Sequence, residues 1–259
     1  MTRLLIAALA VLFAVLRAGP LLAFDHEHQL WTKVTKDYMS ADSMLHYQKL
    51  QADVKANRDH PFPHYIAAIQ AVTKKDYGGW SATEQMAFLI NAYNALTVKL
   101  ILDNYPVESI RKIGGILTKP WSVKFFKLLD GQAQALDPIE HEILRPTFKD
   151  YRVHAAVNCA SFSCPPLRAE AFVAPRLNAQ LDEQMQQWLA DPKRNECDAK
   201  EGTLKLSKIF EWYADDFVNW GGGVKAVVSK HGPEACKQAA AGKGKISFLE
   251  YDWKLNEAK

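Results

Sequence analysis

One stretch of the sequence gathers residue types that could act together in covalent catalysis. His141 and His154 precede Cys159, which follows an alternating apolar and polar segment at residues 151–158. A cysteine is a strong nucleophile only as its thiolate, and a neighbouring histidine is the usual base near neutral pH. The pattern therefore predicts a thiol nucleophile at Cys159, with His141 as its base and His154 as the substitute base.

Neighbouring polar residues can supply the other parts of such a site. A catalytic histidine needs an orienting carboxylate or amide, and we expect Glu140 or Asn91 in this role, with Asp137 or Asn158 as further choices. Backbone N–H groups of residues 159–163 would form the oxyanion hole. The side chains expected to contact a substrate are Asn94, Arg145, Asn158 and Ser161.

The cysteine loop allows three interpretations. Cys159 can be a free nucleophile, it can form a small disulfide ring with Cys164, or both cysteines can bind zinc together with His141 and His154. The sequence does not choose among them, and we assign no metal site and no cofactor, since no nucleotide, flavin or haem motif is present.

The second pair of cysteines has a simpler interpretation. Cys197 and Cys236 flank a helical segment and face no candidate site residue, so we expect a structural disulfide that closes a long loop. Four cysteines allow three connectivities, which the sequence alone leaves open.

The N-terminal residues have the layout of a secretory signal peptide. A short basic start is followed by 13 residues, Leu4 to Leu16, without a polar side chain, and then by Gly19 and Pro20. This apolar run is shorter than the roughly 20 residues that span a bilayer. We expect residues 1–23 to be removed, although Leu21 and Leu22 leave a retained anchor as the alternative. The mature protein would then be periplasmic or secreted, without stable membrane insertion.

Composition limits the classes of partner. The 259 residues are 48% hydrophobic and 24% charged, with a net charge of +3. Two of the 32 basic residues, Arg3 and Arg17, lie in the signal segment, which leaves 30 basic against 29 acidic residues. So balanced a charge gives no reason to expect binding to nucleic acid, and we expect a small-molecule or peptide ligand of unknown identity.

Local patterns predict an α+β fold in a single domain at residues 24–259, with helices packed around a small, mainly antiparallel sheet. The strongest helix begins at the capping box Ser81-x-x-Glu84 and ends at Asn104. A second helix begins at Asp137 and ends at Pro146. Other helices are expected at residues 25–39, 65–72, 177–189 and 207–218, and extended segments at 44–54, 121–135 (a hairpin), 151–158, 203–206 and 246–255.

Four ordered motifs resemble the DUF547 family, as found in secreted bacterial proteins. They are Phe88-Leu89-Ile90-Asn91-Ala92-Tyr93-Asn94-Ala95-Leu96, Leu136-Asp137-Pro138-Ile139-Glu140-His141-Glu142-Ile143-Leu144-Arg145, the segment 152–167, and Tyr251-Asp252-Trp253-Lys254-Leu255-Asn256. The family has no established activity, and its pattern has glycine where this chain has Ala160. The resemblance implies that the first loop cysteine is retained more often than the second in intracellular plant members, which favours a thiol site at Cys159.

Two functions follow as hypotheses. The first is a thiol hydrolase or acyl or peptidyl transferase that uses Cys159, with a distant analogy to papain-like and transglutaminase-like enzymes. Those enzymes usually place the cysteine before the histidine, whereas here both histidines come first. The second is a disulfide-stabilised binding module in which Glu140, His141 and Arg145 recognise a polar ligand without catalysis.

Overall fold

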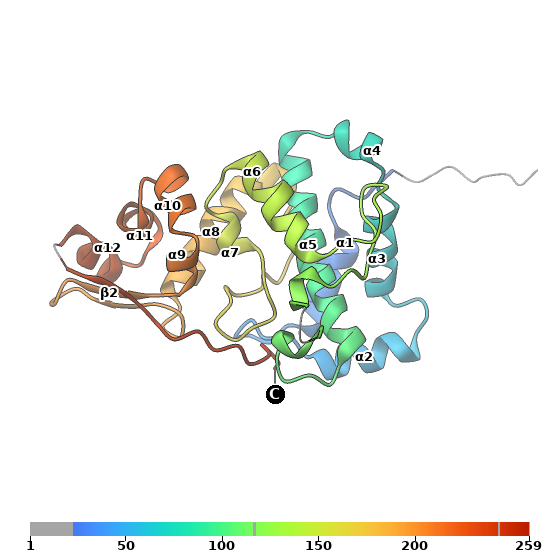
Figure 1. Ribbon diagram of the computed structural model, residues 1–259, viewed down its shortest axis with the longest axis horizontal. Helices are drawn as coiled ribbons and strands as arrows, with labels where there is room; N and C mark the ends of the chain where they lie inside the picture. The colour runs from blue at the N-terminus through green and yellow to red at the C-terminus, as the bar shows by residue number, and fades with distance from the viewer. Residues whose placement is uncertain (1–22, 116–117, 243, 259) are drawn as a thin grey trace, which may run out of the picture.

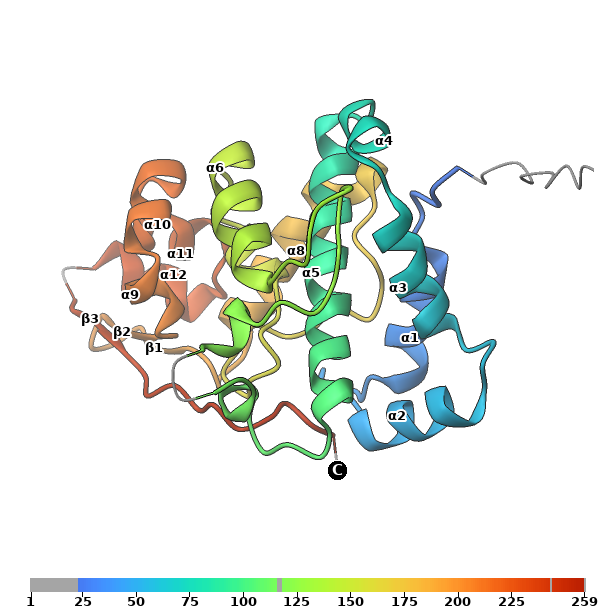
Figure 2. The ribbon, with the colours of Figure 1, turned by 45° about the vertical axis from the view of Figure 1, so that its right-hand side comes forward.

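The computed structural model describes residues 23–115, 118–242 and 244–258 (Figure 1). The expected signal peptide, apart from Ala23, lies outside these residues. The helices of the N-terminal part of the chain lie on one side of the segment that carries Cys159 and Cys164, and the helices of the C-terminal part lie on the other side (Figures 1 and 2). The first group comprises α1 (Gln29–Tyr38), α2 (Tyr47–Ala56), α3 (Pro61–Ala71), α4 (Lys74–Gly78) and α5 (Ala82–Asn104).

Helix α5 is the central element of the larger core. Its capping box is formed as expected, because the side chains of Ser81 and Glu84 each accept a hydrogen bond from the backbone N–H of the other. Apolar residues all around the helix are buried, including Phe88, Leu89 and Ile90. Among the described residues α5 is the one helix long and apolar enough to cross a membrane, yet 89% of its apolar window is buried inside the protein. It is packed as a core helix.

The segment after α5 contains short helical turns. These are η1 (Ile110–Lys112), η2 (Pro120–Ser122), the π-helix η3 (Pro138–Leu144), α6 (Arg145–Phe148), α7 (Val153–Ala156) and η4 (Ala174–Arg176). The prediction that Pro146 ends the helix was wrong, since α6 continues directly from η3. A π-helical turn bonds residue i to i+5, so the wider turn before Pro146 accommodates a residue that would clash in a regular helix.

Two extended predictions were also wrong. Residues 151–158 form the single turn α7, not a strand, and nearly all of their side chains are buried, so their alternation does not distinguish an inner from an outer face. Residues 44–54 lie largely in α2, which buries Tyr47 and Leu50 at helical spacing. The hairpin at 121–135 is reduced to one antiparallel bridge, between Phe126 and Gln134.

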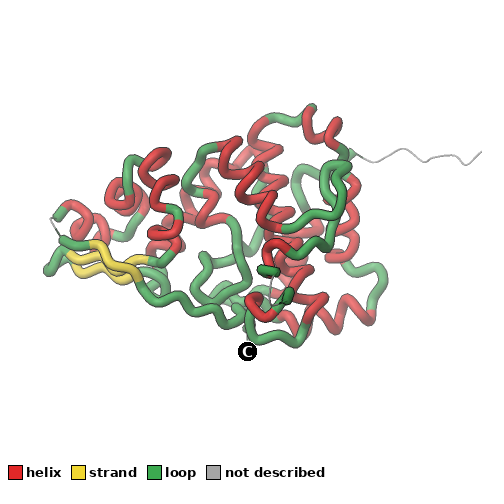
Figure 3. Tube along the Cα trace, in the orientation of Figure 1, coloured by secondary structure: helices red, strands yellow, loops and turns green. Residues whose placement is uncertain are grey.

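The C-terminal part has its own core and the sheet (Figure 3). Strands β1 (Glu196–Asp198), β2 (Thr203–Leu206) and β3 (Ile246–Phe248) pair in that order, antiparallel between β1 and β2 and parallel between β2 and β3. The α+β class is therefore confirmed, but the sheet is mixed rather than mainly antiparallel, and β3 is shorter than the expected 246–255. The helices here are α8 (Leu177–Ala190), α9 (Ile209–Trp212), α10 (Ala214–Gly221), α11 (Val224–His231) and α12 (Glu234–Ala241).

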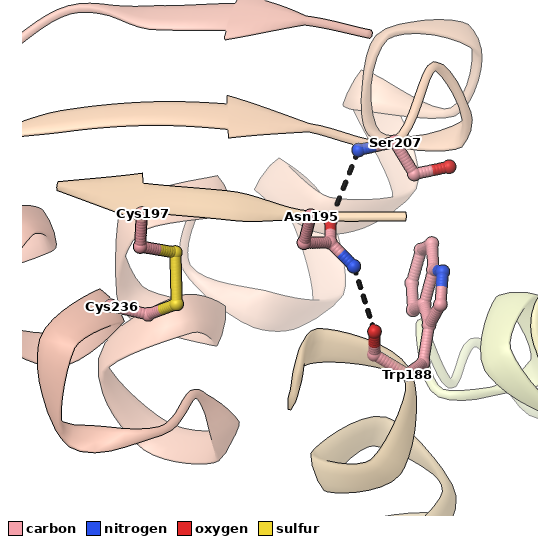
Figure 4. The surroundings of a disulfide bond; sticks show 5 residues. All are labelled: Trp188, Asn195, Cys197, Ser207 and Cys236. Carbon is pink, nitrogen blue, oxygen red and sulfur yellow. Dashed lines mark hydrogen bonds between the residues drawn. A yellow bond between two sulfur atoms is a disulfide. The ribbon is translucent and has the colours of Figure 1, made fainter. Parts of the chain in front are cut away.

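The expected disulfide joins Cys197 on β1 to Cys236 on α12 (Figure 4). Asn195, just before β1, connects the same region to neighbouring elements. Its side chain donates to the Trp188 carbonyl at 2.8 Å and accepts from the Ser207 backbone N–H at 3.0 Å. The disulfide thus links the sheet, through β1, to α12, the last helix of this core.

Removal of this bond is expected to destabilise the protein. The Cys197→Ser, Cys236→Ser double variant frees a loop with a sequence separation of 39 residues, which should lower the free energy of unfolding by about 3 kcal/mol. Urea denaturation measures this loss. The Cys159→Ser, Cys164→Ser variant is the matched control, because it removes two sulfur atoms without opening that loop. Equal losses in the two variants would contradict the prediction.

Candidate functional site

A cleft of about 1150 Å³ brings together several residues that the sequence analysis singled out. Cys159, His154, His141 and Glu140 all line it, together with Cys164. Glu140 and His141 belong to the π-helical turn η3, and His154 belongs to α7. The loop after α7 contributes the two cysteines. The structure therefore places the predicted nucleophile and both candidate bases around one space.

The C-terminal segment holds the cysteine loop in place. After β3 the chain runs from the sheet along the lower edge of the view toward α2 (Figure 1). There it lies beside residues 160–163, where the backbone N–H groups of Phe162 and Ser163 donate to the carbonyls of Lys254 and Asp252 at 2.7 and 3.2 Å. This pairing brings Tyr251 to the Cys159 thiol.

Asparagine side chains fix the same loop from inside. Asn94 on α5 donates to the Ala156 carbonyl at 2.9 Å and accepts from the Asn158 backbone N–H at 2.8 Å. Asn158 in turn donates to the Pro165 carbonyl at 2.8 Å and accepts from the Ala160 N–H at 2.8 Å. Asn94 and Asn158, expected to contact substrate, are therefore engaged in positioning the backbone, because buried amides require partners.

Asn91 lies away from the candidate bases. Its side chain donates to the Phe172 carbonyl at 2.7 Å and accepts from the Phe172 N–H at 3.0 Å. Both of its hydrogen-bonding ends are thus occupied by the backbone of one residue. The structure does not bring Asn91 to His141 or His154 as an orienting group.

The Cys159 thiol lies among polar groups. Its Sγ is 2.7 Å from Cys164 Sγ, 3.1 Å from the Tyr251 hydroxyl and 3.5 Å from Ser161 Oγ. Burial raises the pKa of Cys159, but the hydrogen bonds from Cys164, Tyr251 and Ser161 outweigh it and lower the pKa to about 7. The Tyr251 hydroxyl remains protonated, because burial holds its own pKa well above the usual range. A substantial fraction of Cys159 is therefore thiolate at neutral pH.

Most backbone N–H groups that were expected to form the oxyanion hole already donate to acceptors within the protein. Within residues 159–163, the N–H of Cys159 donates to Cys164 Sγ at 2.8 Å and that of Ala160 to Asn158 Oδ1. The N–H groups of Phe162 and Ser163 donate to the C-terminal segment. Four of the five backbone donors in the loop are thus already used inside the protein, which leaves the Ser161 N–H as the one amide of residues 159–163 with no backbone or side-chain acceptor among the described residues.

A buried carboxylate organises the other side of the cleft. Asp216 on α10 accepts from His154 Nε2 and from Arg145 Nε, each at 2.7 Å. Burial raises the pKa of Asp216, but these two partners lower it to about 2. His154 also stacks on Tyr213, with ring centroids 4.0 Å apart. Since Asp216 carries no proton at neutral pH, His154 Nε2 is the protonated ring nitrogen in this bond.

Of the groups expected to orient His141, Asp137 lies beside it, with Oδ1 3.9 Å from His141 Nε2, whereas Glu140 has another partner. His141 Nδ1 lies 2.8 Å from Arg145 Nη1, and its side chain is 38% exposed. Glu140 is buried and accepts from the Tyr213 hydroxyl at 2.8 Å. Glu140 therefore does not orient His141, and Arg145 is bound to Asp216 and His141 within the protein.

The zinc interpretation finds no geometric support in the described ranges. His154 is bonded to Asp216 and His141 to Arg145, so the two histidines do not meet at the cysteines. No group of three or more His, Cys, Asp or Glu side chains in the described part of the chain is arranged to hold a metal ion. A tetrahedral site would require four such ligands at one point.

Aromatic side chains form a further wall of the cleft. Trp212 on α9 packs against Tyr251 and Trp253, with ring centroids 4.8 and 5.7 Å away, and Trp121 packs against Trp253 at 5.6 Å. Trp212 is 46% exposed. The guanidinium of Arg111 lies over the Trp253 ring at 5.2 Å. This wall suits a ligand that presents an apolar or planar face.

Three residues of the site, Tyr251, Asp216 and Tyr213, were not predicted from the sequence. Tyr251 had a signal, since it begins the last of the four family-like motifs. Asp216 and Tyr213 had none, because residues 207–218 were expected to form one helix. The chain instead changes direction at Tyr213, between α9 and α10; Tyr213 lines the cleft, and Asp216 bonds His154 behind it.

Loss of the Tyr251 hydroxyl should raise the pKa of Cys159 and lower the fraction of thiolate at neutral pH. Tyr251→Phe removes one donor to the Cys159 sulfur, and a hydrogen bond to a charged group contributes ~1.5–3 kcal/mol, so we expect the pKa of Cys159 to rise by about one to two units. The rate of alkylation by iodoacetamide as a function of pH measures this pKa. Tyr213→Phe is the control, because that hydroxyl donates to Glu140 instead. The same shift in both variants would contradict the role of Tyr251.

The comparisons with known proteins address part of the chain. No curated protein and no solved structure matches it. The match that was found is to a family model described as "Protein of unknown function, DUF547", and it covers residues 77–189. This range includes both candidate bases and both cleft cysteines but ends before Asp216 and Tyr251. Residues 77–189 are therefore similar to the DUF547 family, whose function is unknown.

Proposed function

We propose that the protein is a thiol-dependent hydrolase or acyl or peptidyl transferase that acts in the periplasm or outside the cell. Cys159 is the nucleophile and His154, oriented by Asp216, is the acid–base residue. The observation that carries the proposal is a thiol with a lowered pKa in the same cleft as a histidine bonded to a buried carboxylate. The disulfide between Cys197 and Cys236 supports an oxidising compartment.

The thiolate attacks first. Tyr251, Ser161 and Cys164 stabilise Cys159 as the thiolate, so the nucleophile does not depend on a histidine to remove its proton. Among the described residues no histidine is hydrogen-bonded to Cys159 Sγ. Attack on an acyl carbonyl forms a C–S bond and places negative charge on the carbonyl oxygen. Tyr93, which is buried in the cleft wall and whose pKa burial holds well above its usual range, supplies a protonated hydroxyl nearby.

His154 then acts on the leaving group. With Nε2 bonded to Asp216, Nδ1 is the ring nitrogen available to a group in the cleft. In this step the His154 ring carries a proton on both nitrogens, with its charge balanced by Asp216. Nδ1 gives its proton to the leaving amine or alcohol, the ring becomes neutral, and the thioester to Cys159 remains. In the second half of the reaction, Nδ1 accepts a proton from water or from an acceptor amine, which attacks the thioester and releases the thiolate. His154 thus replaces His141, our first expectation, as the acid–base residue.

The substrate is proposed by class. The cleft has room for a peptide or a small molecule, and its aromatic wall favours an acyl group with an apolar or planar part. Arg111 and Lys119 also line the cleft and favour a substrate with an anionic group. No nucleic-acid or membrane partner enters this proposal.

Trapping of the thioester tests the proposal directly. The mature protein is incubated with a panel of activated esters and thioesters, quenched in acid and analysed by intact mass and peptide mapping. We expect an acyl group on Cys159 that turns over on longer incubation. If no acyl group forms on a folded, reduced protein, or if it forms on another residue, the proposal fails. The binding module is then the better interpretation, and Cys159 and Cys164 substitutions should have matching effects on stability.

A further inference from the structure

The two cleft cysteines support a second activity that needs no acyl group. We propose that Cys159 and Cys164 form a thiol–disulfide exchange centre, in which Cys159 attacks an external disulfide and Cys164 resolves the mixed disulfide. This goes beyond acyl transfer, because the co-reactant is a disulfide of a small thiol or of a protein and the product is an oxidised cysteine pair.

The first observation is the position of the two sulfur atoms. Cys159 Sγ and Cys164 Sγ lie 2.7 Å apart, and a disulfide bond measures ~2.05 Å. The loop fixes this arrangement, since Cys164 N–H donates to the Ser161 carbonyl at 3.0 Å and Arg194 Nε donates to the Cys164 carbonyl at 2.5 Å. A bond between these sulfurs therefore requires little movement of the backbone.

The second observation is that the two thiols differ. Cys159 is partly exposed and lines the cleft, whereas Cys164 is 2% exposed. Burial and the neighbouring Cys159 raise the pKa of Cys164 well above its usual range, while that of Cys159 is lowered. An accessible thiolate beside a buried thiol is the arrangement that an attacking and a resolving cysteine require.

The third observation concerns the loop amides. Four N–H groups of residues 159–163 already have partners in the protein, so this loop offers few donors to a carbonyl oxyanion. Thiol–disulfide exchange places no negative charge on oxygen, because the charge passes from one sulfur to another. The observed hydrogen bonds are therefore compatible with exchange as they stand.

The exchange is balanced without further reagents. The Cys159 thiolate attacks one sulfur of R–S–S–R, which forms Cys159–S–S–R and expels R–S⁻. Cys164 loses its proton to solvent and attacks Cys159 Sγ, which forms the Cys159–Cys164 disulfide and expels the second R–S⁻. The external disulfide is reduced to two thiols and the cysteine pair is oxidised by two electrons. An external dithiol reverses the reaction.

The other disulfide is an internal reference. Cys197 and Cys236 belong to the C-terminal core, and neither lines the cleft. The Cys197–Cys236 disulfide closes a loop with a sequence separation of 39 and lies within a packed core. We therefore expect it to persist when the Cys159–Cys164 pair is reduced. The two pairs can thus be followed in one sample.

A glutathione redox titration tests the proposal. The folded mature protein is equilibrated at a series of ratios of reduced to oxidised glutathione, alkylated, and mapped by peptide mass. We expect reversible oxidation of Cys159 with Cys164, and an unchanged bond between Cys197 and Cys236. A pair that stays reduced at every ratio, or one that is reduced only after unfolding, overturns the proposal.

Trapping the mixed disulfide separates the two roles. Cys164→Ser should accumulate glutathione on Cys159, with a lifetime on the order of 100-fold longer than in the wild type, since an adjacent thiol acts at a high effective concentration. Cys159→Ser should acquire none on Cys164. Cys164→Ala serves as a second variant in case serine disturbs the fold. Equal lifetimes in wild type and variants overturn the assignment of Cys164. This test uses no acyl substrate. Disulfide exchange can therefore fail while acyl transfer is confirmed by thioester trapping, and acyl transfer can fail while disulfide exchange is confirmed.

Discussion

Cys159→Ser is expected to abolish turnover of acyl substrates and to leave the free energy of unfolding nearly unchanged. The substitution replaces one sulfur by oxygen at a partly exposed position, so it creates no large cavity. A hydroxyl, however, is not ionised by the hydrogen bonds that lower the pKa of the thiol to about 7, and within the described ranges no histidine is hydrogen-bonded to the Cys159 sulfur to act as its base. Serine at this position therefore lacks the activated nucleophile.

Steady-state kinetics with the ester that labels Cys159 measures the loss, and urea denaturation measures stability. Cys164→Ser is the comparison: it keeps the nucleophile but removes one group that lowers the pKa of Cys159, so its turnover should fall at neutral pH and recover at higher pH. Substantial residual turnover in Cys159→Ser would rule out nucleophilic catalysis by this residue. A large loss of stability would instead identify a structural cysteine.

His154→Gln is expected to lower kcat/KM for an amide substrate by ~10²–10⁴-fold, the usual contribution of general acid–base catalysis. An activated ester has a leaving group that needs no proton, so its acylation should fall much less. The pKa of Cys159, measured by alkylation, should stay near 7 because the groups that lower it are Cys164, Tyr251 and Ser161. The difference between the two substrates is the signature of a proton donor.

His141→Gln provides the comparison. His141 lines the same cleft but is partly exposed and hydrogen-bonded to Arg145, so we expect little change with either substrate. A large loss in His141→Gln together with a small loss in His154→Gln would restore His141 as the base. Parallel losses for amide and ester in His154→Gln would indicate a structural effect through Asp216 rather than proton transfer.

Much of the fold could be predicted because its signals are local. The capping box at Ser81 and Glu84 and the continuous apolar surface that follows define α5 within one residue at its start. The loop character of residues 159–167 also holds. By contrast α7 was mistaken for a strand, because a segment buried on every side carries no periodicity that separates helix from strand.

The candidate site was predicted in part for the same reason. Cys159, His154, His141 and Glu140 lie within 20 residues of one another in the chain, and short elements necessarily keep them close. Their partners lie far away in sequence. Tyr251 is 92 residues from Cys159, and Asp216 is 62 residues from His154.

The sequence by itself therefore determined the candidate site residues, the central helix, the α+β class and the expectation of a structural disulfide. The tertiary structure decided which histidine is hydrogen-bonded to a buried carboxylate, which cysteines are paired, and what lowers the pKa of Cys159. The physical reason is that helix capping and apolar periodicity depend on near neighbours along the chain. The ionisation of a buried thiol or carboxylate depends instead on desolvation and on hydrogen bonds from whichever segments the fold places against it.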